Sequence, residues 1–197
     1  MKRGFIWLFL ISIAGQAGLF AATPRETKGP PLLKPEILKK IDQDREIYVR
    51  AKLENGKVYT YSSSMRVNAG LHRTRDILTD YRIYSKVVPY IDQADYEAQS
   101  HVLHLKGGIF KFYLQSWIHF EERGDRWIHF RVIRGHFTGM EGNIYFEPHP
   151  EKGTRVYFEG GLEADHWPPQ WVIERGAEVV FSYTAHQMRK QIEEKQK

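Results

Sequence analysis

Two copies of one tetrapeptide lie close together in the middle of the chain, and they constrain the fold more than any other feature. Trp-Ile-His-Phe stands at 117–120 and again at 127–130, and Arg123-Gly124-Asp125 lies between the copies. Because alternate side chains of a strand point to opposite faces, each copy places Ile and Phe on one face and Trp and His on the other. A turn at Gly124 would fold the copies into a hairpin with one dry face and one aromatic face.

The pairing register decides whether these two faces stay separate, because a slip of one residue moves every side chain to the other face. An even sum of the paired residue numbers keeps the two kinds of side chain apart. The dry face then holds Ile118, Phe120, Ile128, Phe130 and Val132, and the aromatic face holds Trp117, His119, Trp127, His129 and Arg131. Burial of the dry face favours this arrangement, so we predict an even sum.

The composition excludes several classes of site. The 197 residues include no cysteine, which rules out disulfides, thiolate catalysis and cysteine-ligated metals. The formal charge is +5, and removal of Lys2 and Arg3 with a signal segment leaves 27 basic and 24 acidic side chains, a charge of +3. This charge is too small and too dispersed to indicate a nucleic-acid partner.

The tightest histidine pair, His101 and His104, points to opposite faces of a strand, so neither a metal nor a cofactor is predicted.

The first 22 residues have the pattern of a signal peptide. Lys2 and Arg3 precede an apolar run over 5–14, and Gly15-Gln16-Ala17 fits the small-x-small rule for cleavage. The alternative is an uncleaved anchor over 4–22, which is short for a span and contains Gln16. The sequence therefore predicts a periplasmic or secreted protein of a bacterial envelope, with no stable membrane span after cleavage.

The rest of the chain divides into a proline-rich linker with a short helix, 23–46, and one domain, 47–195. Asn55-Gly56 predicts a hairpin between 47–53 and 57–67, and a helix is expected at 72–84. Further strands are predicted as an antiparallel meander at 95–106, 109–122, 126–134, 142–147 and 154–162. A last helix over 168–194 would be about 35–40 Å long, enough to cross the sheet.

This order of elements resembles the helix-grip fold of the START-like superfamily (SRPBCC), most closely its polyketide-cyclase and coenzyme Q-binding branch. Residues 77–81, Ile-Leu-Thr-Asp-Tyr, followed by Tyr84 and Val88-Pro89, resemble a helix of that branch. Gly-Asn-Ile-Tyr-Phe-Glu-Pro at 142–148 and Gly-Thr-Arg-Val-Tyr at 153–157 resemble two of its strands, with Ile144 in place of the usual Trp. The resemblance covers 56 to about 194 and implies an α+β fold, a curved antiparallel β-sheet wrapped around a long C-terminal α-helix.

The resemblance also implies a ligand cavity between the dry face of the sheet and the last helix. Its predicted lining is Met65, Phe112, Leu114, Ile118, Phe130, Val132, Phe146, Phe158, Gly176 and Val180. A glycine inside a helix costs up to about 1 kcal/mol relative to alanine, so Gly176 is expected to allow close approach to a ligand or to the sheet.

The leading functional prediction is binding of a hydrophobic small molecule or lipid in this cavity, without catalytic residues. One alternative is an enzyme of the cyclase or dehydratase kind, which would require an ionisable group inside the cavity. Another is a protein-interaction module that binds an envelope protein, or a second copy as a weak homodimer. Its candidate surface is the aromatic face of Trp117, His119, Trp127, His129 and Arg131, since Trp and Arg are common at interface centres.

Overall fold

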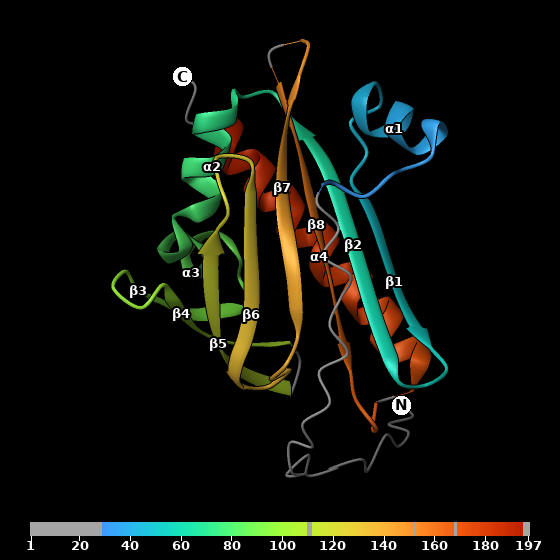
Figure 1. Ribbon diagram of the computed structural model, residues 1–197, viewed down its shortest axis with the longest axis vertical. Coiled ribbons are helices and arrows are strands. Elements are labelled where there is room, and N and C mark those ends of the chain that lie inside the picture. Colours follow the sequence, from blue (N-terminus) through green and yellow to red (C-terminus); the bar gives the residue numbers. More distant parts are fainter. Residues whose placement is uncertain (1–28, 110–111, 152, 168, 195–197) are drawn as a thin grey trace, which may run out of the picture.

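The structure is a computed structural model, and it describes residues 29–109, 112–151, 153–167 and 169–194, apart from the side chains of residues 109, 112 and 172. The predicted signal peptide and the first part of the linker lie outside the described residues. The described part forms an eight-stranded antiparallel sheet that curves around one long helix (Figure 1). Helices and strands therefore lie in two main layers, as an α+β fold requires.

The sheet has the strand order β1-β2-β8-β7-β6-β5-β4-β3. Consecutive strands are adjacent in the sheet except β2 and β3, because β2 pairs with β8 and β3 lies at the opposite edge. The strands are β1 (Tyr48–Glu54), β2 (Val58–Val67), β3 (Ile91–Glu97), β4 (Val102–Ile109), β5 (Phe112–Glu122), β6 (Trp127–Gly135), β7 (Glu141–His149) and β8 (Gly153–Glu163). The helices are α1 (Pro35–Asp42), α2 (Leu71–Thr79), η1 (Tyr81–Ile83), α3 (Tyr84–Val87) and α4 (Gln170–Glu194).

Two predicted elements are each divided in the structure. The strand expected at 95–106 is in fact β3 and β4, joined by a turn in which His101 adopts a φ of 53°. Gly107, which was expected to end that strand, lies inside β4. A Cβ there would stand 2.1 Å from the carbonyl oxygen of Tyr90, so the position requires glycine. The helix expected at 72–84 is interrupted at Asp80, whose ψ of 72° is not helical.

The register predicted for the central hairpin is confirmed. Phe120 is opposite Phe130 and Ile118 is opposite Val132, which are even sums. One residue further the register shifts, because Ile133 is an extra residue in β6 and Trp117 is opposite Arg134. The bulge leaves Trp117 on the outer face of the sheet, the face turned away from α4.

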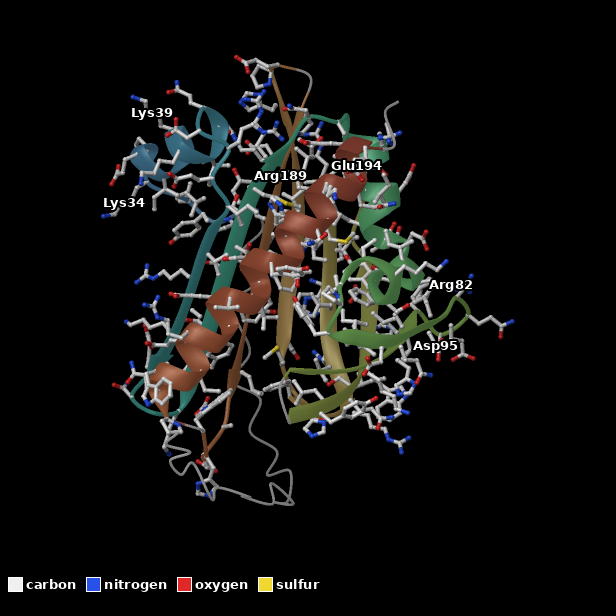
Figure 2. All side chains as sticks on the ribbon, turned by 180° about the vertical axis from the view of Figure 1, so that it is seen from behind. Lys34, Lys39, Arg82, Asp95, Arg189 and Glu194 are labelled. Carbon is white, nitrogen blue, oxygen red and sulfur yellow. The ribbon has the colours of Figure 1, made fainter. Side chains whose placement is uncertain are left out.

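Helix α4 crosses the inner face of the sheet and is tied to it at several points (Figure 2). Near its start, the carboxylate of Glu174 accepts a hydrogen bond from the Leu53 N–H of β1 at 3.0 Å. In its middle, the Tyr90 hydroxyl donates to the Val180 carbonyl at 2.8 Å. Towards its end, Met188 and Ile192 are buried in the core. Among the helices of the described residues, none combines the length and apolar character needed to cross a bilayer.

Helix α1 packs against the outer face near the ends of β2 and β8. Pro35 stands at its first turn, where a missing N–H costs nothing, and Ile41 is completely buried. The side chain of Asp42, the last residue of α1, pairs with Arg155 of β8. The short helix predicted within 23–46 is therefore present, and it is packed onto the domain.

Candidate ligand-binding site

Four aromatic rings meet between the inner face and α4, and we call them the inner ring cluster. They are Tyr61 of β2, Phe130 of β6, Phe158 of β8 and Phe181 of α4. Tyr61 stacks on Phe181 with a centroid distance of 4.8 Å, and Phe130 stacks on Phe158 at 5.2 Å. Phe158 also lies 5.2 Å from Tyr61 and 5.7 Å from Phe181, so it joins the two stacks.

Two glycines give this cluster its geometry. Gly142 of β7 and Gly160 of β8 are opposite each other, and their other neighbours are Phe130 and Tyr61 respectively. A Cβ at Gly142 would stand 2.5 Å from the Phe130 ring, and one at Gly160 would stand 2.4 Å from the Tyr61 hydroxyl. The missing side chains therefore allow both aromatic rings to lie directly on the backbone of the sheet.

Three apolar residues in this region are only half-buried. Phe158 and its cross-strand neighbour Ile144 are partly accessible, as is Phe181 above them. Their flanking neighbours Ile128 and Phe146 are buried. The sheet and the helix thus both contribute apolar side chains to this region, so an apolar ligand bound there would contact both layers.

The Tyr61 hydroxyl is the polar group within this apolar region. The residue is only 3% exposed, and its hydroxyl has no hydrogen-bond partner among the described residues. Burial raises the pKa of Tyr61 well above its usual value, so the group keeps its proton. An unpaired buried hydroxyl costs about 1–3 kcal/mol, which a ligand that accepts its hydrogen bond would recover.

The structure places the residues predicted to line a cavity in different environments. Met65, Phe130, Val132 and Phe146 are buried, while Ile118, Phe158 and Val180 are half-buried. Leu114 is 37% exposed, towards one end of the sheet. The side chain of Phe112 lies outside the described part of the chain. Tyr61 and Phe181 were not among the predicted lining residues. The alternation of Tyr59, Tyr61, Met65 and Val67 along β2 is the signal that could have placed Tyr61 on the same face as Met65.

The expectation that Gly176 allows close approach to the sheet is wrong. Gly176 lies on an exposed side of α4, and a Cβ there would meet nothing within 4 Å. The next residue, Ala177, is the one that packs against the core. The sequence alone could not distinguish these two neighbours, because the contacts between α4 and the sheet decide which side of the helix faces the core.

Side chains of the aromatic face, which is the outer face of the sheet, form hydrogen bonds and ring contacts with their neighbours in the fold. Trp127 donates its indole N–H to Asn143 Oδ1 at 2.9 Å and stacks on Tyr145. His129 Nδ1 lies 3.1 Å from the same Asn143 oxygen. Trp117 stacks on His104 at 4.3 Å, with the Arg134 guanidinium over its ring at 4.5 Å.

The remaining members of this face follow the same pattern. Arg131 forms an ion pair with Glu141, and His119 is opposite Arg131 in the sheet. Among the described residues, the most exposed large apolar side chains lie elsewhere. Leu32 precedes α1, and α4 carries Trp171, Val179 and Tyr183. Tyr113, Ile133 and Phe137 are exposed on β5, on β6 and after β6. Within the described residues, no three histidine, aspartate or glutamate side chains are grouped as a metal site requires.

Comparison with known proteins identifies the fold. No protein-family model matches the sequence, and no curated protein is similar enough in sequence to count as a relative. Solved structures do match. A START superfamily protein from Mycobacterium smegmatis has a TM-score of 0.59 at 16% identity, over 68% of this chain and 97% of that one.

Two further structures show the same similarity. The STAR-related lipid transfer protein from Xanthomonas axonopodis has a TM-score of 0.55 at 16% identity, over 74% of this chain and 93% of that one. The Zhui aromatase/cyclase from Streptomyces sp. R1128 has a TM-score of 0.58 at 12% identity, over 71% of this chain and 96% of that one. The chain therefore has the START-like (SRPBCC) helix-grip fold, as the sequence predicted.

Proposed function

We propose that this protein is exported to the bacterial envelope and binds a hydrophobic small molecule or a lipid between the inner face of the sheet and α4. The observation that carries the proposal is that half-buried apolar residues of the sheet, Ile144 and Phe158, meet Phe181 of α4. Full burial of one exposed large apolar side chain contributes about 1.5–3 kcal/mol, so a ligand that covers the remaining surface of these three gains part of that free energy.

The polar requirement of the ligand follows from Tyr61. Because this hydroxyl keeps its proton and has no acceptor in the described part of the chain, a ligand with one carbonyl, ether or hydroxyl oxygen near an apolar body would complement it. The description of one similar structure as a lipid transfer protein supports a ligand of this kind. Binding without covalent chemistry is the function that this arrangement favours.

A cyclase-like enzyme is the alternative suggested by the similarity to an aromatase/cyclase. Such a reaction needs a group that exchanges a proton near neutral pH. The raised pKa of Tyr61 makes it a poor base there, although it can donate a hydrogen bond to a ligand oxygen. The chemistry of the inner ring cluster thus favours a binding protein over an enzyme.

Export is proposed from the sequence pattern of the first 22 residues, which are outside the described part. Cell fractionation of the bacterial source, or of a host expressing the full chain, tests it. Recovery of a shortened mature chain from the periplasmic or secreted fraction would support export, and recovery of the unshortened chain from the cytoplasm would contradict it.

Ligand binding is tested by native mass spectrometry and solvent extraction of the purified protein, followed by titration with fluorescent fatty acids and quinones. Ala177→Leu fills space on the side of α4 that faces the sheet, and Gly176→Ala is a matched control on the exposed side of the same turn. We expect Ala177→Leu to reduce binding and Gly176→Ala to leave it unchanged. Absence of retained ligand and of probe binding in the unsubstituted protein would overturn the proposal.

A further inference from the structure

The side of α4 that faces away from the sheet carries large apolar side chains. Trp171, Val179 and Tyr183 are 71%, 67% and 40% exposed. Arg175 stands among them, with 80% of its side chain exposed. Figure 2 views the molecule from this side, and no other element of the described chain lies across α4. The surface is on the opposite side of the helix from Phe181, which packs against the core.

The four side chains form one ridge along the helix, and we call Trp171, Arg175, Val179 and Tyr183 the α4 ridge. Consecutive members are four residues apart, so each lies next to the following one on the helix surface. Ridges of this spacing interdigitate in the commonest kind of helix–helix packing, in which the ridge of one helix lies in the groove beside the ridge of the other. The α4 ridge therefore has the form of a surface that packs against another helix.

Gly176 leaves a gap beside this ridge. It is exposed, and a Cβ there would meet nothing within 4 Å. It is not one of the described glycines with a positive φ, so neither the backbone nor the packing of the described fold requires glycine at this position. A glycine inside a helix is less favourable than alanine, but it allows another backbone or side chain to approach closely. The gap lies next to Val179, which is large enough to fill the same gap on another helix.

The charges at the middle of the ridge are complementary to themselves. Arg175 pairs with Glu178 of the same helix at 3.5 Å, on one side of the ridge. When two such helices cross antiparallel about a two-fold axis, each pair meets its own copy in the reverse direction. Arg175 then lies near Glu178 of the second copy, and the reverse contact forms as well. An anionic membrane surface would be attracted by Arg175 but repelled by Glu178, so the pair favours a copy of itself over a membrane.

We infer that the α4 ridge binds a second copy of this chain, with the two α4 helices antiparallel and Val179 of each copy in the gap at Gly176 of the other. The same patch is used twice, as a two-fold dimer requires. A large aromatic side chain buries about 150–250 Å², so two ridges with one Trp and one Tyr each cover less than the roughly 1,600 Å² of a standard stable interface. The dimer is therefore weak and reversible, and its population depends on protein concentration.

The inference is tested by sedimentation velocity over a wide range of protein concentration, with the same N-terminal form in every variant. We expect a monomer–dimer equilibrium in the unsubstituted protein. Gly176→Gln and Val179→Gln should each weaken it about tenfold or more, as loss of a central interface contact does. Leu32→Gln is the control, because Leu32 is fully exposed, at 102%, and lies outside α4. It should leave the equilibrium unchanged.

Two charge reversals test how the copies are arranged. Arg175→Glu leaves two acidic side chains at this point of each copy, and Glu178→Arg leaves two basic ones. Each variant alone should associate less than the unsubstituted protein, because like charges then face each other. An equimolar mixture of the two should regain association, since each contact between copies then joins opposite charges. Mixing cannot restore the ion pair within one helix, so recovery in the mixture supports the antiparallel dimer and its absence would contradict it.

Three results would overturn the inference. One is a monomer at every concentration. Another is a dimer whose affinity is the same in Gly176→Gln as in Leu32→Gln, because the contact would then lie elsewhere on the surface. The third is a monomer that phosphatidylglycerol vesicles capture and that Trp171→Ala releases, because the ridge would then face a membrane. Far-ultraviolet circular dichroism of each variant shows that its fold is retained, as the open space at Gly176 leads us to expect.

Discussion

Arg155 and Asp42, which are 113 positions apart, form an ion pair with two hydrogen bonds. The Arg155 Nε donates to Oδ1 at 2.7 Å and its Nη2 donates to Oδ2 at 2.6 Å. Both side chains are less than one fifth exposed, at 18% and 16%. The pair connects the last residue of α1 to a central strand of the sheet, and with the buried Ile41 it explains why α1 packs onto the domain.

Replacement of Asp42 by asparagine is expected to destabilise the protein by about 1–3 kcal/mol. The substitution keeps the shape of the side chain but removes its charge, so Arg155 loses a charge-assisted partner in a poorly solvated position. Urea unfolding of both proteins measures the difference. The control is Glu54→Gln, which breaks an ion pair with Lys52 whose side chains are both 49% exposed and which should change stability by less than about 1 kcal/mol. Equal unfolding midpoints for Asp42→Asn and the unsubstituted protein would show that the pair contributes nothing.

The same pair predicts a dependence of stability on pH. The hydrogen bond from Arg155 holds the pKa of Asp42 below its ordinary value of 3.8, with further lowering by the charges of Arg155, His149 and Arg66. A carboxyl group with a lowered folded-state pKa stabilises the fold fully above its ordinary pKa and loses this effect as pH falls through the folded-state value.

We therefore expect the stability difference between the unsubstituted protein and Asp42→Asn to be constant near neutral pH and to shrink below about pH 4. Unfolding curves for the two proteins across the acidic range provide the measurement. The difference between variants is the relevant quantity, because other carboxylates titrate in both proteins. A gap that stays constant down to pH 2 would contradict this assignment.

Two glycine substitutions are expected to have opposite effects. Gly142→Ala places a methyl group 2.2 Å from the Glu159 carbonyl oxygen and 2.5 Å from the Phe130 ring, so the strand or the ring must move. We expect a loss of about 1–3 kcal/mol, as for other overpacked cores. Gly176→Ala adds a methyl group in open space on a helix and should gain up to about 1 kcal/mol.

Thermal and urea unfolding of the two alanine variants and the unsubstituted protein measure these changes in stability. Because both add a single methyl group, the comparison isolates the effect of position from the effect of composition. A tolerated Gly142→Ala would mean that Phe130 has space to move, and the geometry described for the inner ring cluster would then not be needed for stability.

Tyr61→Phe is expected to stabilise the ligand-free protein by about 1 kcal/mol, since it removes a buried hydroxyl for which the described residues offer no partner. Tyr157→Phe is the matched control, because the hydroxyl of Tyr157 donates to Glu147 at 2.8 Å and its removal should reduce stability. Chemical unfolding of delipidated samples measures both. Equal losses in the two variants would show that the Tyr61 hydroxyl has an acceptor in the folded protein.

The sequence predicted the fold best where burial of one face makes apolar and polar side chains alternate along a strand. Alternation of apolar and polar side chains predicted the central hairpin, its register and the strands that follow, because a slip would have exposed Phe120 and Phe130. It did not predict the turn before β4, since His101 adopts its positive φ without the glycine that usually marks such a turn. The bulge at Ile133 was equally hidden, because an extra residue in one strand leaves no local sequence signal.

The candidate sites were predicted less well than the fold, for a physical reason. Tyr61 meets Phe158 and Phe181 from distant parts of the chain, and only the crossing of α4 over the sheet decides that these rings touch. The hydrogen bond from Arg189 to the Arg45 carbonyl is similar, since these two residues are 144 positions apart. No spacing rule connects residues whose proximity depends on the finished tertiary structure.

The pairing of β2 with β8 has a consequence for how the protein folds. The two strands are opposite each other from Val58 and Glu163 to Val67 and Thr154, so their contacts link residues about a hundred positions apart. Closing a chain loop of that length costs conformational entropy before the pairing contributes any stability, which slows folding in proteins rich in such contacts. The β1-β2 hairpin can form early from local contacts, but one side of β2 keeps unpaired N–H and C=O groups until β8 has been synthesised. During that interval the free edge of β2 is the place where this chain is most prone to pair with another unfinished copy of itself.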